Sequence, residues 1–312
     1  SVLGTSQNNN PIDIEQTREK HVTGAISTLH DYLALTKPRV MSLLLFTAFG
    51  GMVLASGGIP PGWILASVLL GGAMASGGAG AINHATETDV DGNMHRTKAR
   101  PVASGRIKTS QAVVFGITLN IAAFAVILAG ANLLAALVTI SGTIIYIFVY
   151  TLWLKRTTVH NIVIGGAAGA VPPIAGWAAV TGTIDLPAWY LFAIVFFWTP
   201  PHFWALAILI RDDYRIAGVP MLPVVVGIKE TSRSILLYTL LLLPLTFLLF
   251  IASEKLGSLY LIGSLLTGFV YTALAISHLF RKSRSATSLL YRFSLIYLFL
   301  IFLFVIIDGS NA

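Results

Sequence analysis

Residues 231–252 read TSRSILLYTLLLLPLTFLLFIA and set the fold class of this 312-residue chain. The stretch carries one charge, Arg233, near its start. The apolar run that follows is long enough to cross the hydrocarbon core of a bilayer, which takes about 20 residues. Eight other stretches have this character, so that the predicted spans are 39–56, 62–82, 109–130, 132–153, 159–180, 187–210, 231–252, 257–279 and 286–307. They predict an all-α, polytopic membrane protein built as a bundle of nine transmembrane helices around a central cavity.

The composition agrees with a membrane protein. Hydrophobic residues make up 55% of the chain and charged residues only 11%, which is too little charge to cover a soluble domain. The absence of cysteine excludes disulfides, thiolate zinc sites and cysteine nucleophiles. The net charge is +7, but the basic residues lie in short loops between spans. We therefore attribute them to membrane topology and expect no nucleic-acid partner.

The loops alternate between a basic set and a nearly uncharged set. Lys255 is the one lysine or arginine outside the basic set, among 20 in the chain. By the positive-inside rule the basic side is cytoplasmic. We expect an integral, multi-pass protein of the plasma (inner) membrane, with the N-terminus cytoplasmic and the C-terminus outside. The two long charged loops, 83–108 and 211–230, then place the active site on the cytoplasmic side.

The N-terminal part differs in character from the rest. Residues 1–30 are polar and lack the apolar core of a signal peptide. They are interpreted as a disordered or interfacial tail, with a short interfacial helix around Leu29, Tyr32 and Leu33. Residues 31–312 form the transmembrane domain in this division of the chain.

The first charged loop opens with oxygen-bearing side chains at helical spacing. Asn83, Glu87 and Asp91 follow one another at i, i+4 and i+8, so on a helix they share one face. Converging oxygen ligands suit a hard cation such as Mg²⁺, which binds a few carboxylates together with substrate phosphates. Asp89 falls off this face. Because polar groups are costly at membrane depth, we favour a metal site over a solvated surface.

A basic run follows the acidic residues directly. Arg96, Lys98 and Arg100 suit the oxygens of a phosphate group. A metal ion together with arginines neutralises a diphosphate leaving group. Taken alone, these basic residues are better explained as topology signals. Next to the acidic cluster they predict that a diphosphate binds here.

The second charged loop repeats the combination. Asp212 and Asp213 lie between two arginines at a predicted helix end. They hold a second Mg²⁺ or form a surface network with the arginines, and both interpretations stay open. Lys229 precedes the next helix start, where anions are favoured. It is either a diphosphate ligand or a topology charge.

Histidines and aromatic residues near the basic side are further candidates. His202 is an intramembrane ionisable residue in the stretch Pro201-His202-Phe203-Trp204, which marks it as a functional candidate. It contacts haem iron or a substrate carboxylate, or it is a core histidine after a proline kink. His160, at the head of the fifth span, is a similar case. Trp204 and its aromatic neighbours are candidates for the wall of a pocket around an apolar chain.

Four stretches resemble the UbiA-type intramembrane prenyltransferase superfamily, and within it the haem-farnesylating branch. Together they reach from about residue 35 to 230. They are 35–40 (LTKPRV); 83–91 (NHATETDVD) with 96–101 (RTKARP) and 104–106 (SGR); 161–170 (NIVIGGAAGA) with 172–173 and 176–177; and 201–208 (PHFWALAI) with 213–214 and 220–224 (PMLPV). One departure is Glu87-Thr88, where the branch has Asp-Arg. Glutamate keeps an oxygen ligand, but any role of the arginine is lost at Thr88.

The resemblance implies a reaction and a set of roles. A farnesyl group passes from farnesyl diphosphate to a vinyl group of haem B, and water addition gives haem O. One or two Mg²⁺ ions are implied as cofactors, with haem B as a substrate and a haem A synthase or terminal oxidase as pathway partners. The implied metal ligands are Asn83, Glu87, Asp91, Asp212 and Asp213. The implied catalytic residues are Asn83, Glu87, Asp91, Asp213 and Lys229, and the implied substrate-binding residues are Lys37, Arg39, Arg96, Lys98, Arg100, Asp212, Tyr214, His160, His202 and Trp204.

Two rival functions stay open at this point. Another prenyltransferase of the superfamily would act on 4-hydroxybenzoate or a menaquinone precursor, and the Pro-His-Phe-Trp stretch argues against it. A transporter also combines intramembrane carboxylates with helices broken by glycine and proline. A transporter, however, needs polar groups near the bilayer midplane, whereas these acids cluster at predicted helix ends.

Overall fold

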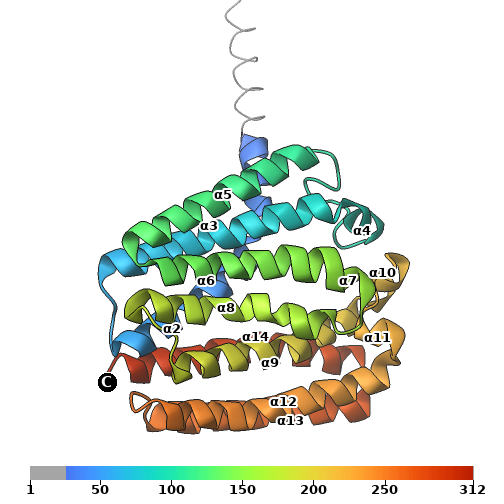
Figure 1. The fold of residues 1–312 in the computed structure, drawn as a ribbon. Coiled ribbons are helices and arrows are strands. Elements are labelled where there is room, and N and C mark those ends of the chain that lie inside the picture. The colour runs from blue at the N-terminus through green and yellow to red at the C-terminus, as the bar shows by residue number, and fades with distance from the viewer. Residues whose placement is uncertain (1–25, 312) are drawn as a thin grey trace, which may run out of the picture.

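The computed structural model describes residues 26–311, and every long regular element in that range is a helix (Figure 1). Nine of the described helices are long and apolar enough to cross a membrane. They are α2 (Pro38–Ser56), α3 (Gly62–Thr86), α5 (Thr109–Gly130), α6 (Leu133–Ile144) continuing through the π-helix η1 (Ile145–Leu154) into α7 (Lys155–Thr157), α8 (Asn161–Thr181), α9 (Leu186–Leu209), α12 (Gly227–Ala252), α13 (Ser258–Arg281) and α14 (Arg284–Gly309). The nine predicted spans are confirmed, with boundaries that differ by a few residues.

Residues 26–35 form a further helix ahead of α2, where the sequence predicts a short interfacial helix. Most of the predicted tail lies outside the described residues. Three short helices occupy the loops, namely α4 (Thr88–Asn93), α10 (Arg211–Ile216) and α11 (Leu222–Val225). All three lie at the same end of the bundle (Figure 1), which we call the charged end. The two long loops of the sequence therefore meet there.

The bundle is organised around α8 and α9, the two most buried spans. Helix α8 packs against α2, α6 and α9, while α9 also packs against α12 and α14. By contrast, only 22% of the residues in the most apolar windows of α5 and of the α6–η1 span are buried, as expected of helices that face lipid. Lipid is as apolar as leucine, so burial of apolar surface does little to hold such helices together.

Small residues allow the central helices to approach backbone to backbone. A Cβ atom added at Gly51 of α2 would lie 2.2 Å from the carbonyl oxygen of Pro173 in α8. Likewise, a Cβ atom at Gly176 of α8 would lie 2.2 Å from the carbonyl oxygen of Ala48. Close packing of this kind is a main source of helix association in membranes. It fixes α2 against α8 and so places Lys37, at the head of α2, inside the charged end.

Candidate active site

The first acidic motif lies at a break between two helices. Asn83 is in the last turn of α3, Glu87 is the residue at which α3 ends, and Asp91 is in α4. The prediction of one continuous helical face is therefore wrong, because the backbone leaves the helix at Glu87, with φ −112° and ψ 20°. The Asn83 carbonyl still accepts from the Glu87 N–H and the Glu87 carbonyl from the Asp91 N–H. These bonds keep the three side chains in register, and each residue is only 2% exposed.

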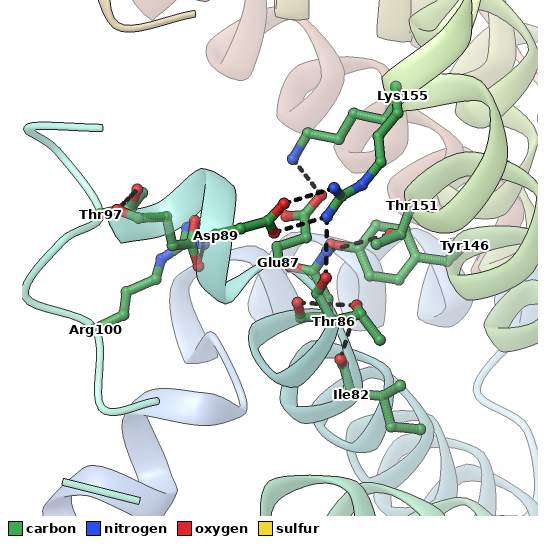
Figure 2. Close-up of polar contacts among 12 residues, drawn as sticks. Ile82, Thr86, Glu87, Asp89, Thr97, Arg100, Tyr146, Thr151 and Lys155 are labelled. Atoms are coloured by element: carbon green, nitrogen blue, oxygen red, sulfur yellow. Dashed lines mark hydrogen bonds and ion pairs between the residues drawn. The ribbon is translucent and has the colours of Figure 1, made fainter. Parts of the chain in front are cut away.

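Each of these three side chains meets a basic group. Lys155 pairs with Glu87 at 2.5 Å (Figure 2). The Lys37 ammonium donates to Asn83 Oδ1 at 2.5 Å, and Arg100 donates to both oxygens of Asp91 at 2.9 Å. Buried charges persist only when paired and hydrogen-bonded. The cluster is thus a network of two carboxylates and one amide oxygen, each in contact with a basic side chain, at the edge of the membrane span.

The π-helix η1 supplies residues that the sequence analysis missed. Hydrogen bonds from i to i+5 wind the chain more loosely than in an α-helix, so residues four, five and nine apart share a face. Tyr146, Tyr150, Thr151 and Lys155 have this spacing. In an α-helix Lys155 would lie about 180° around the axis from Tyr146. No local sequence pattern marks the π-helix, and Lys155 looks like a topology charge.

All four side chains of this η1 face lie beside the acidic cluster. Thr151 accepts from the Asn83 amide at 3.2 Å, and the Tyr146 hydroxyl accepts from Lys37 at 3.3 Å. The Tyr146 and Tyr150 rings are stacked 5.8 Å apart, and Lys155 lies over the Tyr150 ring. Two aromatic faces therefore border the site, as suits a site in which positive charge develops.

Lys37 has an unusual backbone conformation. It is one of two described non-glycine residues with positive φ, at φ 51° and ψ 58°. Such conformations are mildly strained and concentrate at functional sites. This one directs the ammonium inward to Asn83. Burial, and then the positive charge of Arg100, lower the pKa of Lys37 to about 7.

Asp89 stands outside the cluster, as its off-face position predicts. Its side chain is 62% exposed and forms an ion pair with Arg156 at 2.7 Å. Hydrogen bonding by the Arg156 guanidinium lowers the pKa of the Asp89 carboxyl. Arg156 also donates to the Thr86 carbonyl at the end of α3. This pair therefore joins the turn after α3 to the helix that carries Lys155.

The second acidic motif meets the loop that follows α4 through one of its two aspartates. Asp213 accepts from the Arg96 N–H at 3.3 Å, across 117 residues of sequence. Asp212 is exposed and forms an ion pair with Arg215 instead. Tyr214 is buried, and this burial raises the pKa of its phenol. Asp213, Tyr214 and Arg96 thus belong to the same end of the site, whereas Asp212 faces outward.

The structure does not bring the other sequence candidates into the acidic cluster. His202 lies between α9 and α14. Its Nδ1 is hydrogen-bonded to Ser294 Oγ at 2.6 Å, and its ring stacks on Trp198 and Tyr291. Trp204 packs edge-on against Tyr238 of α12. The remaining four candidates are exposed at the charged end: Arg39, Lys98, His160 and Lys229.

The oxygen-rich character of the cluster fits a hard cation. Within residues 26–311 there is no preassembled group of three or more His, Cys, Asp or Glu ligands, since only Glu87 and Asp91 are carboxylates and Asn83 is an amide. Carboxylate and amide oxygens, together with water and substrate phosphates, are the ligands that Mg²⁺ prefers. The surrounding cations equally suit a polyanionic partner.

Comparison with known proteins gives a consistent result. The model of the UbiA prenyltransferase family matches residues 44–304. A protoheme IX farnesyltransferase of Gloeobacter violaceus is 48% identical over 296 residues, which cover 93% of this chain and 95% of that protein. A protein of the same name from Thermus thermophilus is 50% identical over 284 residues, 91% of this chain. The chain spans only 46% of that longer relative.

Solved structures with low sequence identity share the fold. The structure of a digeranylgeranylglyceryl phosphate synthase superposes with a TM-score of 0.76 at 18% identity, covering 92% of this chain and 100% of that one. A UbiA homolog from Archaeoglobus fulgidus bound to GPP and Mg²⁺ gives 0.66 at 18% identity, covering 88% and 99%. The family match over most of the chain and the extended identity establish that this chain belongs to the UbiA prenyltransferase family, whose fold these structures share.

Proposed function

We propose that this protein is a protoheme IX farnesyltransferase, which transfers the farnesyl group of farnesyl diphosphate to a vinyl group of haem B. The observation that carries the proposal is the near full-length identity to proteins of that name, 48% over 95% of the Gloeobacter protein. The buried cluster of oxygens and cations at the charged end supports it, because diphosphate chemistry needs both. The product is haem O, with diphosphate released.

In this proposal, basic side chains around the cluster bind the diphosphate. Arg96 and Lys98 are exposed on the loop after α4. Lys37, Arg100 and Lys155 contact Asn83, Asp91 and Glu87, respectively. Such cations pair well with phosphate oxygens. Asn83, Glu87 and Asp91 would hold one Mg²⁺ and Asp213 a second, with Asp212 the weaker candidate because it faces outward. Bound Mg²⁺ would neutralise the leaving diphosphate.

The reaction divides into balanced steps. The bond between C1 of the farnesyl group and the diphosphate oxygen breaks, which leaves an allylic cation. The terminal vinyl carbon of haem B bonds to C1, and positive charge moves to the carbon beside the porphyrin ring. Water adds there and loses one proton, which leaves the hydroxyl group. The stacked rings of Tyr146 and Tyr150 border the cluster and are placed to stabilise the allylic cation.

This chemistry requires no strong general base, so the absence of a catalytic dyad among the described residues fits it. His202 is tied to Ser294, and we assign it a packing role between α9 and α14. His160 is the exposed histidine nearest the head of α8, which leaves it as a candidate for haem contact. The same proposal includes a pathway partner that supplies or uses the haem, namely a haem A synthase or a terminal oxidase.

A substrate comparison tests the proposal. The purified protein with farnesyl diphosphate and Mg²⁺ should modify haem B and leave 4-hydroxybenzoate unchanged. Modification of the phenol alone would assign the chain to a different branch of the family. Release of no diphosphate with either acceptor would favour a transporter.

A further inference from the structure

The hairpin of α13 and α14 carries positive charge that no acidic residue of its own balances. Arg281 and Lys282 end α13 and Arg284 begins α14, while Arg292 follows within α14. Between Glu254 and Asp308 the sequence contains no aspartate or glutamate. Some other basic side chains at the charged end, among them Arg100, Lys155 and Arg233, are paired with a carboxylate. None of the four hairpin residues forms an ion pair within residues 26–311.

Arg292 lies on the membrane side of this group. It is eight residues into α14, which places its Cα about 12 Å along the helix from Arg284. The apolar side chains before and after it on the same outward stripe, Leu289 and Ile296, are 54% and 50% exposed. Arg292 is exposed as well.

An arginine on a lipid-facing stripe is costly unless its charge reaches the headgroups. Its long apolar stem allows the guanidinium to extend toward the interface while the backbone stays in the hydrocarbon region. The turn of Arg281, Lys282 and Arg284 lies at that interface. Phe280, in the last turn of α13, is 80% exposed, so an apolar ring accompanies the charges. The positive-inside rule explains basic residues in loops, but it does not explain an arginine such as Arg292 within the membrane span.

We propose that this hairpin binds the headgroup of an anionic phospholipid. Arg292 reaches the phosphate from the acyl-chain side, and Arg281, Lys282 and Arg284 surround it from the loop side. A phosphate held between arginines and a lysine forms charge-assisted hydrogen bonds. The occupant is a lipid and not a free anion, because Arg292 and Phe280 both lie on the lipid-facing surface. The inference is independent of the proposed reaction.

Native mass spectrometry of the full chain in detergent tests this proposal. Phosphatidylglycerol is titrated against a constant excess of phosphatidylcholine, and bound lipids are counted. Arg292→Gln should weaken phosphatidylglycerol binding about fivefold, because each basic residue near an anionic lipid surface contributes about 1 kcal/mol. Replacing all four hairpin cations should reduce it to the level of phosphatidylcholine. Arg292→Lys should stay close to the parent protein.

Arg233→Gln is the matched control, since Arg233 is an exposed arginine at the same end but is paired with Glu230. It should bind phosphatidylglycerol as the parent does. Equal affinity for the parent and Arg292→Gln would overturn the proposal. Displacement of the lipid by inorganic phosphate at similar concentration would also overturn it, because the site would then recognise a free anion. Size-exclusion profiles of each variant confirm that the comparison is made between folded proteins.

Discussion

At the residue scale, the charged side chains of this protein divide into two groups by what they contact. Several of those at the charged end contact one another, and Asn83, Glu87 and Asp91 each contact a basic side chain. Those at the opposite end contact helix termini. Lys255 donates to the Leu54 and Ala55 carbonyls at the end of α2. Lys255, the one basic residue outside the basic set of loops, therefore has a structural role.

Asp91→Asn separates a chemical role of the carboxylate from a structural one. The amide keeps the size but removes a charged ligand, so turnover should fall by about 100-fold or more. Steady-state release of diphosphate measures this. The matched control is Asp308→Asn at the opposite end, where Asp308 accepts from the Gly257 and Tyr260 N–H groups. The Asp308→Asn variant should lose about 1 kcal/mol of stability and keep its activity. Equal activity losses in the Asp91→Asn and Asp308→Asn variants would contradict the metal assignment.

Lys255→Met tests the explanation for the one basic residue on the uncharged side. Methionine retains much of the apolar stem but leaves two helix-end carbonyls without their donor. We expect a loss of about 1–2 kcal/mol in the free energy of unfolding, measured by denaturant titration in detergent. Turnover should be unchanged, since Lys255 is remote from the charged end. An unchanged stability would mean that water replaces the ammonium at no cost.

At the element scale, the spans are simple to predict and their registers are not. Runs of about 20 apolar residues need no tertiary contact to be identified, so nine spans were predicted to within a few residues. The π-helix η1 was not, because its winding depends on packing and not on a local pattern. Without it, Lys155 cannot be assigned to the face that carries Tyr146. The break at Glu87 was likewise hidden, since the i, i+4, i+8 spacing is equally compatible with an unbroken helix.

The contact between α2 and α8 gives a prediction at the same scale, using two glycines of one helix. Gly176→Ala would press a methyl group onto the Ala48 carbonyl and should destabilise the protein by about 1–3 kcal/mol. A Cβ at Gly169 would meet nothing within 4 Å, so Gly169→Ala should be neutral or stabilising by up to about 1 kcal/mol. Thermal unfolding in detergent compares the two. Similar shifts would show that backbone proximity does not hold α2 against α8.

At the scale of the whole molecule, the bundle has one chemically active end. Both acidic motifs, the basic loop after α4 and the face of η1 meet there, although they come from distant parts of the sequence. The sequence predicts this meeting through helix count and topology, since alternate loops lie on one side. It does not predict which acid meets which base. Those pairings, such as Lys155 with Glu87, depend on tertiary packing.

The orientation of the bundle in the membrane can be tested by cysteine labelling. The chain contains no cysteine, so single cysteines can be introduced without background. Ser258→Cys, at the head of α13, should react with a membrane-impermeant maleimide added to intact cells. Ser283→Cys, at the charged end, should react only after the membrane is opened. The reverse pattern would place the charged end outside.

The most direct test of the central claim is product analysis in water labelled with ¹⁸O. Purified protein, farnesyl diphosphate, haem B and Mg²⁺ should give a porphyrin that has gained one farnesyl group and one ¹⁸O atom, with one diphosphate released per product. The Asp91→Asn variant should give almost none of it. Unmodified haem with the parent protein, or farnesylation of a phenol in its place, would contradict the account.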